Sequence, residues 1–264
     1  MKCGFGFFVA AVLFFFGGLF FWGFRSCEQK PLNVLKVALI QGRPLGSSSD
    51  LHEGFDWDVA FQVAIKMHKV LETKAIWVSD FKSALFEGDV DLVSASMNIT
   101  DERLNEMAMV HVYGKPLPYV TLIFWEPSYK SSVGGNISLR GMGDFFDKHA
   151  VGVVKGSGWE SLLKMYEIKN IKTYAHEHNL VFGLQQGEVG TIVVGLVSAD
   201  LLQKQNSNVW TLKASLDKPY SYGIGLAIKK ERSDLIKQVA DAVKELQGEG
   251  VIDMLQIKWF GKVY

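Results

Sequence analysis

The sequence has very few cysteines and no excess of charge. Only Cys3 and Cys27 occur among 264 residues, and both lie near the N-terminus. The rest of the chain can therefore form neither a disulfide framework nor a thiol site. Basic and acidic residues number 28 each, which leaves no strong field to hold nucleic acid. A hydrophobic content of 48% is typical of a globular protein, and the length predicts one large domain or two lobes.

One long apolar run is present, from Gly4 to Phe24, between Lys2 and Arg25. A run of about 20 residues is long for the apolar part of a signal peptide, and it is just long enough to cross a bilayer as a helix. Both interpretations predict that the remaining chain is exported.

Cys27 lies three residues after this run and resembles the lipidation cysteine of a bacterial lipoprotein. The preceding residues, Phe24 and Arg25, depart from the usual lipoprotein pattern, so an uncleaved signal anchor remains the alternative. We predict that residues 1–27 are a signal peptide or membrane anchor. The protein is then expected on the periplasmic side of the bacterial inner membrane or at the cell surface, attached to the membrane.

Strands and helices alternate after residue 32. Residues 34–41 (VLKVALIQ) predict a buried strand, and apolar residues at helical spacing predict a helix over 55–71. Strands at 74–78 and 90–96 enclose a short helix at 80–88. This order predicts parallel β-α-β units.

A second round of the same pattern begins near residue 150. Strands are predicted at 150–154, 171–175 and 188–197, with a helix after the first strand and another at 177–187. The clearest amphipathic helix starts at Ser233, which we expect to be its N-cap, and ends in glycines. An α/β fold of two lobes accounts for this repetition.

Five stretches, in this order, resemble the extracytoplasmic solute-binding proteins of polar amino-acid ABC transporters. They are EGFDWDVA, LFEGDVDLVSASMNITDER, VGVVKGSGWESLL, LQQGEVGTIVV and YGIGLAIKKERSDLIKQVADAVKELQGEGVIDMLQIKWFG. The resemblance implies a type II periplasmic-binding-protein fold: two lobes, each a mostly parallel sheet flanked by helices, joined by two hinge strands. Lobe 1 is expected to comprise 32–120 plus 218–264, and lobe 2 to comprise 121–217.

Arg103 is the strongest site candidate. A basic residue in the first turn of a helix is mildly disfavoured by the helix dipole, so it suggests an anion nearby. The resemblance implies that Arg103 pairs with the ligand's α-carboxylate, for which a guanidinium offers two parallel donors. It also implies that Ala95 and Ser96 line the cleft, and that Asn98 replaces the family's usual Ser or Thr.

The second lobe contributes the turn KGSGW at 155–159. Backbone N–H groups at a helix start bind anions without a cationic side chain, so Ser157 and Gly158 are expected to contact the same carboxylate. Aromatic cover is expected from Trp77 or Phe81, with Trp159 as a further candidate.

Two acidic residues typical of the family's amino-acid binders are missing. Gly195 stands where the second lobe usually has an acid for the ligand's ammonium group, and Ile40 and Gln41 occupy the region of another. Another acid such as Glu53, or backbone carbonyls with Gln41, could substitute. Otherwise the ligand is not an ordinary free α-amino acid, and Arg43, if it faces the cleft, favours a ligand with a second acid group.

These features favour a binding protein that delivers a small polar carboxylate to an ABC permease, with no catalysis, cofactor or metal, and as a monomer. The histidines His111, His176 and His178 lack metal-site spacing. The alternative is a dehydratase of the cyclohexadienyl or arogenate type, which needs an acid in the cleft; the losses at Ile40 and Gly195 argue against it. A sensory module is less favoured, because no fused domain is expected after Tyr264.

Overall fold

The structure is a computed structural model in which residues 33–41, 52–88, 90–125 and 137–264 are described. These residues form two sheets of five strands each, and they belong to one compact unit, 33–264. The predicted anchor at 1–27, including Cys27, and Arg43 lie outside the described residues.

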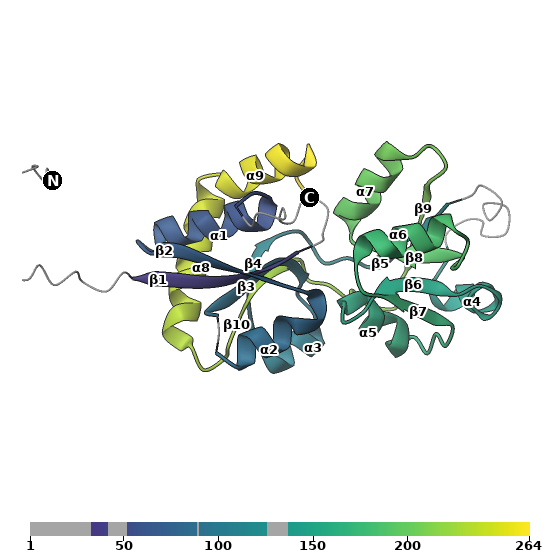
Figure 1. Cartoon of the computed structure of the whole chain (residues 1–264), viewed down its shortest axis with the longest axis horizontal. Helices are drawn as coiled ribbons and strands as arrows, with labels where there is room; N and C mark the ends of the chain where they lie inside the picture. Colours follow the sequence, from purple (N-terminus) through teal and green to yellow (C-terminus); the bar gives the residue numbers. More distant parts are fainter. Residues whose placement is uncertain (1–32, 42–51, 89, 126–136) are drawn as a thin grey trace, which may run out of the picture. The chain divides into compact units, whose positions relative to one another are not determined.

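The first sheet has the strand order β2-β1-β3-β10-β4. Strand β1 (Val34–Ile40) pairs in parallel with β2 (Val70–Ile76) and β3 (Leu92–Asn98), while β10 (Ile224–Ile228) pairs antiparallel with β3 and β4 (Ala108–Tyr113). A late segment of the chain therefore returns to complete the first sheet, as Figure 1 shows.

Helices cover both faces of this sheet. Alternate residues of β1 point to opposite sides, and apolar residues occur on both sides. Leu35, Val37 and Leu39 pack against a layer made by α1 (Phe55–Lys66), α8 (Ser233–Gly248) and α9 (Val251–Phe260). Ala38 and Ile40 face the other layer, around α2 (Phe81–Phe86), with α3 (Asp101–Glu106) after β3.

The second sheet has the order β7-β6-β8-β5-β9. Its parallel strands are β7 (Ile171–Tyr174), β6 (Val151–Val154) and β8 (Thr191–Val193), followed by antiparallel β5 (Tyr119–Phe124) and β9 (Trp210–Ser215).

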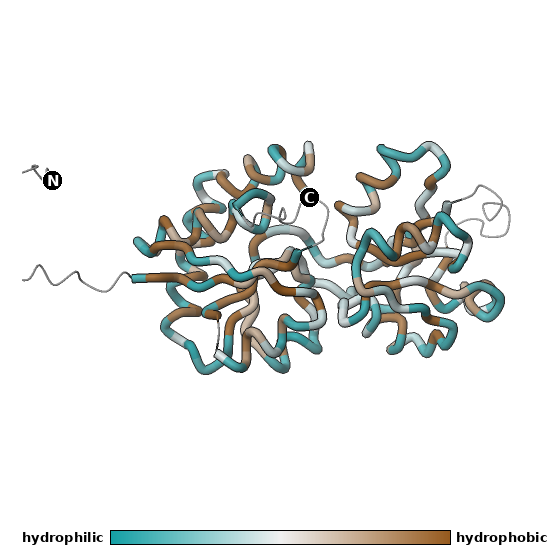
Figure 2. Tube along the Cα trace, in the orientation of Figure 1, coloured by the Kyte–Doolittle hydropathy of each residue, from teal (hydrophilic) through white to brown (hydrophobic). Residues whose placement is uncertain are grey.

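Two buried clusters lie on opposite faces of this sheet. Helices α4 (Gly143–Lys148) and α5 (Gly158–Met165) contribute to one cluster, and α6 (Glu177–Gln185) and α7 (Leu196–Gln205) to the other. Figure 2 shows hydrophobic residues along the strands of both sheets.

Two connecting segments join the sheets. The chain leaves the first sheet between Tyr113 and Tyr119 and returns to it between Ser215 and Ile224. Leu117 and Ser221 form an antiparallel bridge between these segments, and the Leu117 N–H donates a 3.0 Å hydrogen bond to the Ser221 carbonyl.

Several sequence expectations were wrong in detail. Ser233 is the first helical residue of α8 and not its cap, since Arg232 occupies the N-cap and no side-chain cap bond forms. The strand expected at 188–197 covers only Thr191–Val193, because helix α7 begins at Leu196. The strand expected at 74–78 lies earlier, at Val70–Ile76. The helix expected over 55–71 therefore ends at Lys66, and its last two residues, Val70 and Leu71, belong to that strand.

Candidate functional site

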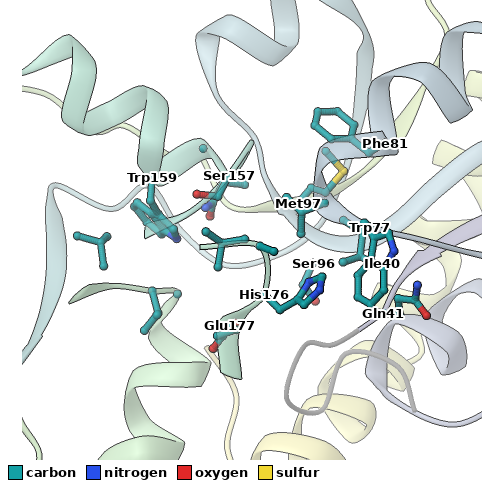
Figure 3. Close-up of a pocket in the computed structure, with 18 of the residues that line it drawn as sticks. Ile40, Gln41, Trp77, Phe81, Ser96, Met97, Ser157, Trp159, His176 and Glu177 are labelled. Carbon is teal, nitrogen blue, oxygen red and sulfur yellow. The ribbon is translucent and has the colours of Figure 1, made fainter. Parts of the chain in front are cut away.

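A pocket lies at the carboxyl ends of the parallel strands of both sheets, where α/β proteins commonly bind ligands. Its empty volume is about 730 Å³, part of which is open to solvent. Nine of the ten residues predicted to bind ligand line it: Gln41, Trp77, Phe81, Ser96, Asn98, Arg103, Ser157, Gly158 and Gly195. Figure 3 shows the side chains of Ser157 and Trp159 on one side of this space and those of Trp77 and Gln41 on the other.

Arg103 is held at the pocket by three interactions that follow from its place in α3. Thr100 is the N-cap, and its Oγ1 accepts a 3.3 Å hydrogen bond from the Arg103 N–H. The guanidinium folds back, so that Nη1 donates to the Asn98 carbonyl at 2.8 Å and the group lies 5.3 Å from the centre of the Phe81 ring. Arg103 is only 8% exposed. A buried cation with a fixed orientation thus borders the pocket.

Ser96 adopts an unusual backbone at the end of β3. Its φ of 44° is left-handed, and it lies where the pairing of β3 with Gly225 and Ala227 of β10 shifts register. The Ser96 hydroxyl donates a 2.7 Å hydrogen bond to Oδ1 of Asp56, which is 2% exposed in the first turn of α1. Strained residues and bulges are frequent beside binding sites. Because the Ser96 hydroxyl donates its one proton to Asp56, it does not donate that proton to a ligand.

Asn98 connects the site to the segment that returns from the second sheet. Its Oδ1 accepts a 3.1 Å hydrogen bond from the hydroxyl of Ser221. Ser221 is 1% exposed and also takes part in the bridge with Leu117. The bulk of the Asn side chain is therefore used in a structural contact between β3 and one of the two connecting segments.

The start of α5 approaches Arg103 from the second sheet. Ser157 is the N-cap and its Oγ accepts a hydrogen bond from the Glu160 N–H. A Cβ placed on Gly158 would lie 3.9 Å from Nη2 of Arg103 and 3.4 Å from the hydroxyl oxygen of Tyr220. Free N–H groups of a helix start and a guanidinium thus lie close together, which suits an anion.

Two ionisable groups support this turn. The Tyr220 hydroxyl donates to the Gly158 carbonyl, and burial raises the pKa of Tyr220 to about 12, although Arg103 acts in the opposite direction. Burial would raise the pKa of Glu160, but hydrogen bonds from Lys164 and from the Gly156 N–H together lower it. The charged carboxylate of Glu160 therefore stabilises the turn at Gly156 by accepting a hydrogen bond from its N–H.

Trp77 and His176 form an aromatic stack between segments of different sheets. Trp77 directly follows β2, and His176 is the N-cap of α6. Their ring centroids are 4.0 Å apart with an interplanar angle of 30°. The sequence did not indicate this role for His176.

Glu177 lies at the pocket although it was not among the residues predicted to bind ligand. It is the first residue of α6, it lines the pocket, and it is 8% exposed. Its position could have been noticed, since an acid two residues after the predicted strand 171–175 lies near the carboxyl end of a parallel strand. The pattern at 177–187 predicted only a helix that begins at this residue.

Several other expectations are modified. Ala95 does not line the pocket, because it is fully buried in the core between β3 and α2. Glu53 is exposed and is not among the lining residues. Gly195 lines the pocket but is the N-cap of α7 and not a strand residue.

Two kinds of feature are absent from the described residues. None of the helices in these ranges is long and apolar enough to cross a membrane. In the same part of the chain, no three His, Cys, Asp or Glu side chains are grouped so that they could hold a metal ion.

Comparisons with known proteins agree with this architecture. The family model described as "Bacterial extracellular solute-binding proteins, family 3" matches residues 35–262. The probable ABC transporter arginine-binding protein ArtJ of Chlamydia trachomatis is 24% identical over 209 residues, which are 78% of this chain and 76% of that protein. The L-cystine-binding protein TcyJ of Escherichia coli is 27% identical over 210 residues, covering 79% of this chain and 74% of that protein.

A solved structure extends the likeness to three dimensions. An ancestral arginine-binding protein bound to arginine superposes with a TM-score of 0.67 and 25% sequence identity. The match covers 87% of this chain and 99% of that one.

Proposed function

Because the chain belongs to the bacterial extracellular solute-binding proteins of family 3, we propose that it is the substrate-binding component of an ABC importer. It binds an amino acid or a related small polar carboxylate between the two sheets and delivers it to a membrane permease. We assign the sheets to two lobes, 32–120 plus 218–264 and 121–217.

The observation that carries this proposal is the position of Arg103 opposite the start of α5. A carboxylate placed there accepts hydrogen bonds from the guanidinium and from N–H groups in the first turn of α5, beginning at Gly158. The Ser157 N–H itself donates to the Val154 carbonyl at 3.1 Å. The guanidinium belongs to the first lobe and the N–H groups to the second, so the ligand gains contacts when the lobes close. The permease can then distinguish the loaded form from the empty one.

Names of the relatives support an amino acid as the ligand. ArtJ is named for arginine and TcyJ for cystine, and both are described as binding proteins. We propose that this chain likewise binds its ligand and releases it unchanged, without a cofactor, as a monomer.

A thermal-shift panel tests the proposal. The panel contains the common L-amino acids, cystine, short peptides and dicarboxylates, and calorimetry then measures the affinity of each compound that raises the melting temperature. A ligand that binds only the folded protein stabilises it by RT ln(1 + [L]/Kd), so the melting temperature rises with ligand concentration and with affinity. The proposal fails if no amino acid or polar carboxylate raises the melting temperature of the protein.

The dehydratase alternative needs an acid in the cleft, and Glu177 supplies one. The absence of acids at Ile40 and Gly195 is therefore no argument against it. Incubation with prephenate and arogenate decides between the two functions. Release of phenylpyruvate or phenylalanine above the uncatalysed rate would favour the enzyme, whereas binding without product favours the transport component.

We also propose that the protein is exported and held at the membrane through Cys27 or through the apolar run from Gly4 to Phe24. Fractionation of cells with and without the Cys27→Ser substitution separates these cases. Loss of lipid labelling together with release from the membrane supports lipidation. Retention at the membrane without labelling supports a signal anchor, and a fully soluble parent protein contradicts both.

A further inference from the structure

Glu177 is an acid buried at the cleft with an incomplete set of hydrogen bonds. The side chain is 8% exposed, and its Oε1 atom is buried with no hydrogen-bond partner in the part of the chain that the structure describes. Nearly all buried polar atoms in proteins have a partner, because burial without one removes hydration and gives nothing in return. This carboxylate oxygen therefore needs an explanation.

The position of Glu177 in α6 explains its charge but not its burial. An acid in the first turn of a helix is favoured by the helix dipole, and exposed acids serve this purpose equally well. Asp144 does so in the first turn of α4, where it is exposed to solvent. Stabilising the helix does not require a carboxylate at the pocket wall.

The charges around the pocket form a complementary pair. Among the described residues that line it, Glu177 is the one acid, and Arg103 is the one lysine or arginine. The acid comes from α6 of the second sheet and the guanidinium from α3 of the first. Trp77 and Trp159 also line the pocket, and the faces of indole rings attract cations.

From this arrangement we propose that Glu177 binds a cationic nitrogen group of the ligand, an ammonium or a guanidinium. Glu177 thus supplies, from the start of α6, the counter-charge that is missing at Gly195. The ligand then carries an acid group toward Arg103 and a cationic group toward Glu177. This inference rests on the proposed function and narrows its ligand class to zwitterions or cationic amino acids.

Substitution of Glu177 by Gln tests the inference. The variant keeps the shape of the side chain and removes its charge, so affinity for an amino acid bound by the parent should fall by about tenfold or more. The matched control is Asp144→Asn. This substitution removes the same charge from the first turn of α4, a helix that packs on the same sheet but does not line the pocket, and it should leave affinity unchanged.

The ligand-free variant gives a second readout. Because the parent carboxylate oxygen is buried without a partner, Glu177→Gln should melt at the same temperature as the parent or higher. If Glu177 served only to stabilise the fold, the substitution would lower the melting temperature. If the Gln variant does not fold, Glu177→Asp keeps the charge but withdraws it by one methylene group, and its affinity should fall as well.

Two arginine analogues distinguish the possible cationic groups. Citrulline keeps the α-ammonium group and replaces the guanidinium by a neutral urea, while δ-guanidinovalerate keeps the guanidinium and lacks the ammonium. If citrulline binds Glu177→Gln more weakly than it binds the parent, the group that contacts Glu177 is the ammonium. Weaker binding of δ-guanidinovalerate assigns the guanidinium, and either result supports the inference.

Three results would overturn it. Equal affinity of an amino acid for the parent and for Glu177→Gln would refute the role of Glu177 and leave the proposed function intact. A parent protein that binds only carboxylates without a cationic group would have the same consequence. If no compound of the panel binds the parent, the inference falls together with the proposed function.

Discussion

Ser96, which has a left-handed φ of 44°, donates a 2.7 Å hydrogen bond from its hydroxyl to Oδ1 of Asp56. The two residues are 40 positions apart, one at the end of β3 and the other in the first turn of α1. Their contact ties a pocket-lining residue, Ser96, to helix α1.

Two substitutions of Ser96 should therefore differ in stability. Ser96→Ala and Ser96→Gly both remove the hydrogen bond to Asp56, but only Gly adopts a left-handed backbone without strain. The free energy of unfolding of Ser96→Gly should exceed that of Ser96→Ala by about 1 kcal/mol. Urea denaturation measures the difference, and equal stability would mean that the backbone at Ser96 is not strained.

Arg103→Ala should abolish or severely weaken ligand binding and leave the fold intact. Losing a desolvated contact between a guanidinium and a carboxylate costs about 2 to 5 kcal/mol. Calorimetry on the folded variant measures the loss. Arg140→Ala is the control, because Arg140 pairs with Asp217 at an exposed site. Binding by Arg103→Ala within about threefold of the parent, under 1 kcal/mol, would remove Arg103 from the site.

The stack of Trp77 on His176 should contribute to ligand binding, because it joins segments of the two sheets. Aromatic pairs contribute about 0.5 to 1.5 kcal/mol beyond their buried area. Trp77→Ala and His176→Ala should each lower affinity by up to about tenfold, and the double variant should be little worse than either.

Phe61→Ala is the control for this pair, since Phe61 stacks on Trp57 within α1 at 4.9 Å and does not line the cleft. Its affinity should equal that of the parent. Additive losses in the Trp77 and His176 variants would show that the two rings act independently.

Gly195→Asp should be tolerated, and it should restore binding to Glu177→Gln. A Cβ at Gly195 meets nothing within 4 Å, and Asp is a favoured N-cap for a helix such as α7. A new contact between a carboxylate and an ammonium is worth about 1.5 to 3 kcal/mol, so the double variant should bind free amino acids about tenfold more tightly than Glu177→Gln.

The control is Gly143→Asp in the same background, because Gly143 also has open space around it and lies at the start of α4. Failure of Gly195→Asp to improve on Glu177→Gln, with both variants folded, would mean that the ligand's cationic group does not reach α7.

Tyr220 should make the protein less stable at high pH. Burial raises its pKa from 10.0 to about 12, so the folded protein holds this proton more tightly than the unfolded chain does. The stability that this provides is complete below pH 10 and is lost as the pH rises toward 12. Tyr220→Phe should remove this part of the pH dependence, as measured by urea unfolding across that range. Parallel curves for the two proteins would contradict the assignment.

The sequence alone determined the α/β class, most strands and the residues around Arg103. The apolar patterns of strands and helices involve residues that are close in the sequence, so strands and helices can be predicted from the linear sequence. Family-specific stretches such as KGSGW extended this to the site, because they carry both residue type and spacing. The same patterns did not predict where each helix or strand begins and ends, as the N-cap before Ser233 and the strand before Gly195 show.

The tertiary structure alone decided which distant side chains meet. Nothing in the linear order pairs Asp56 with Ser96 or Trp77 with His176, since these contacts depend on how strands and helices pack. The role of Glu177 depends on burial, because the same residue in an exposed first turn would only stabilise a helix. A charge becomes a recognition site when packing removes its water and leaves its oxygen without a partner, and that condition is set by residues far away in the chain.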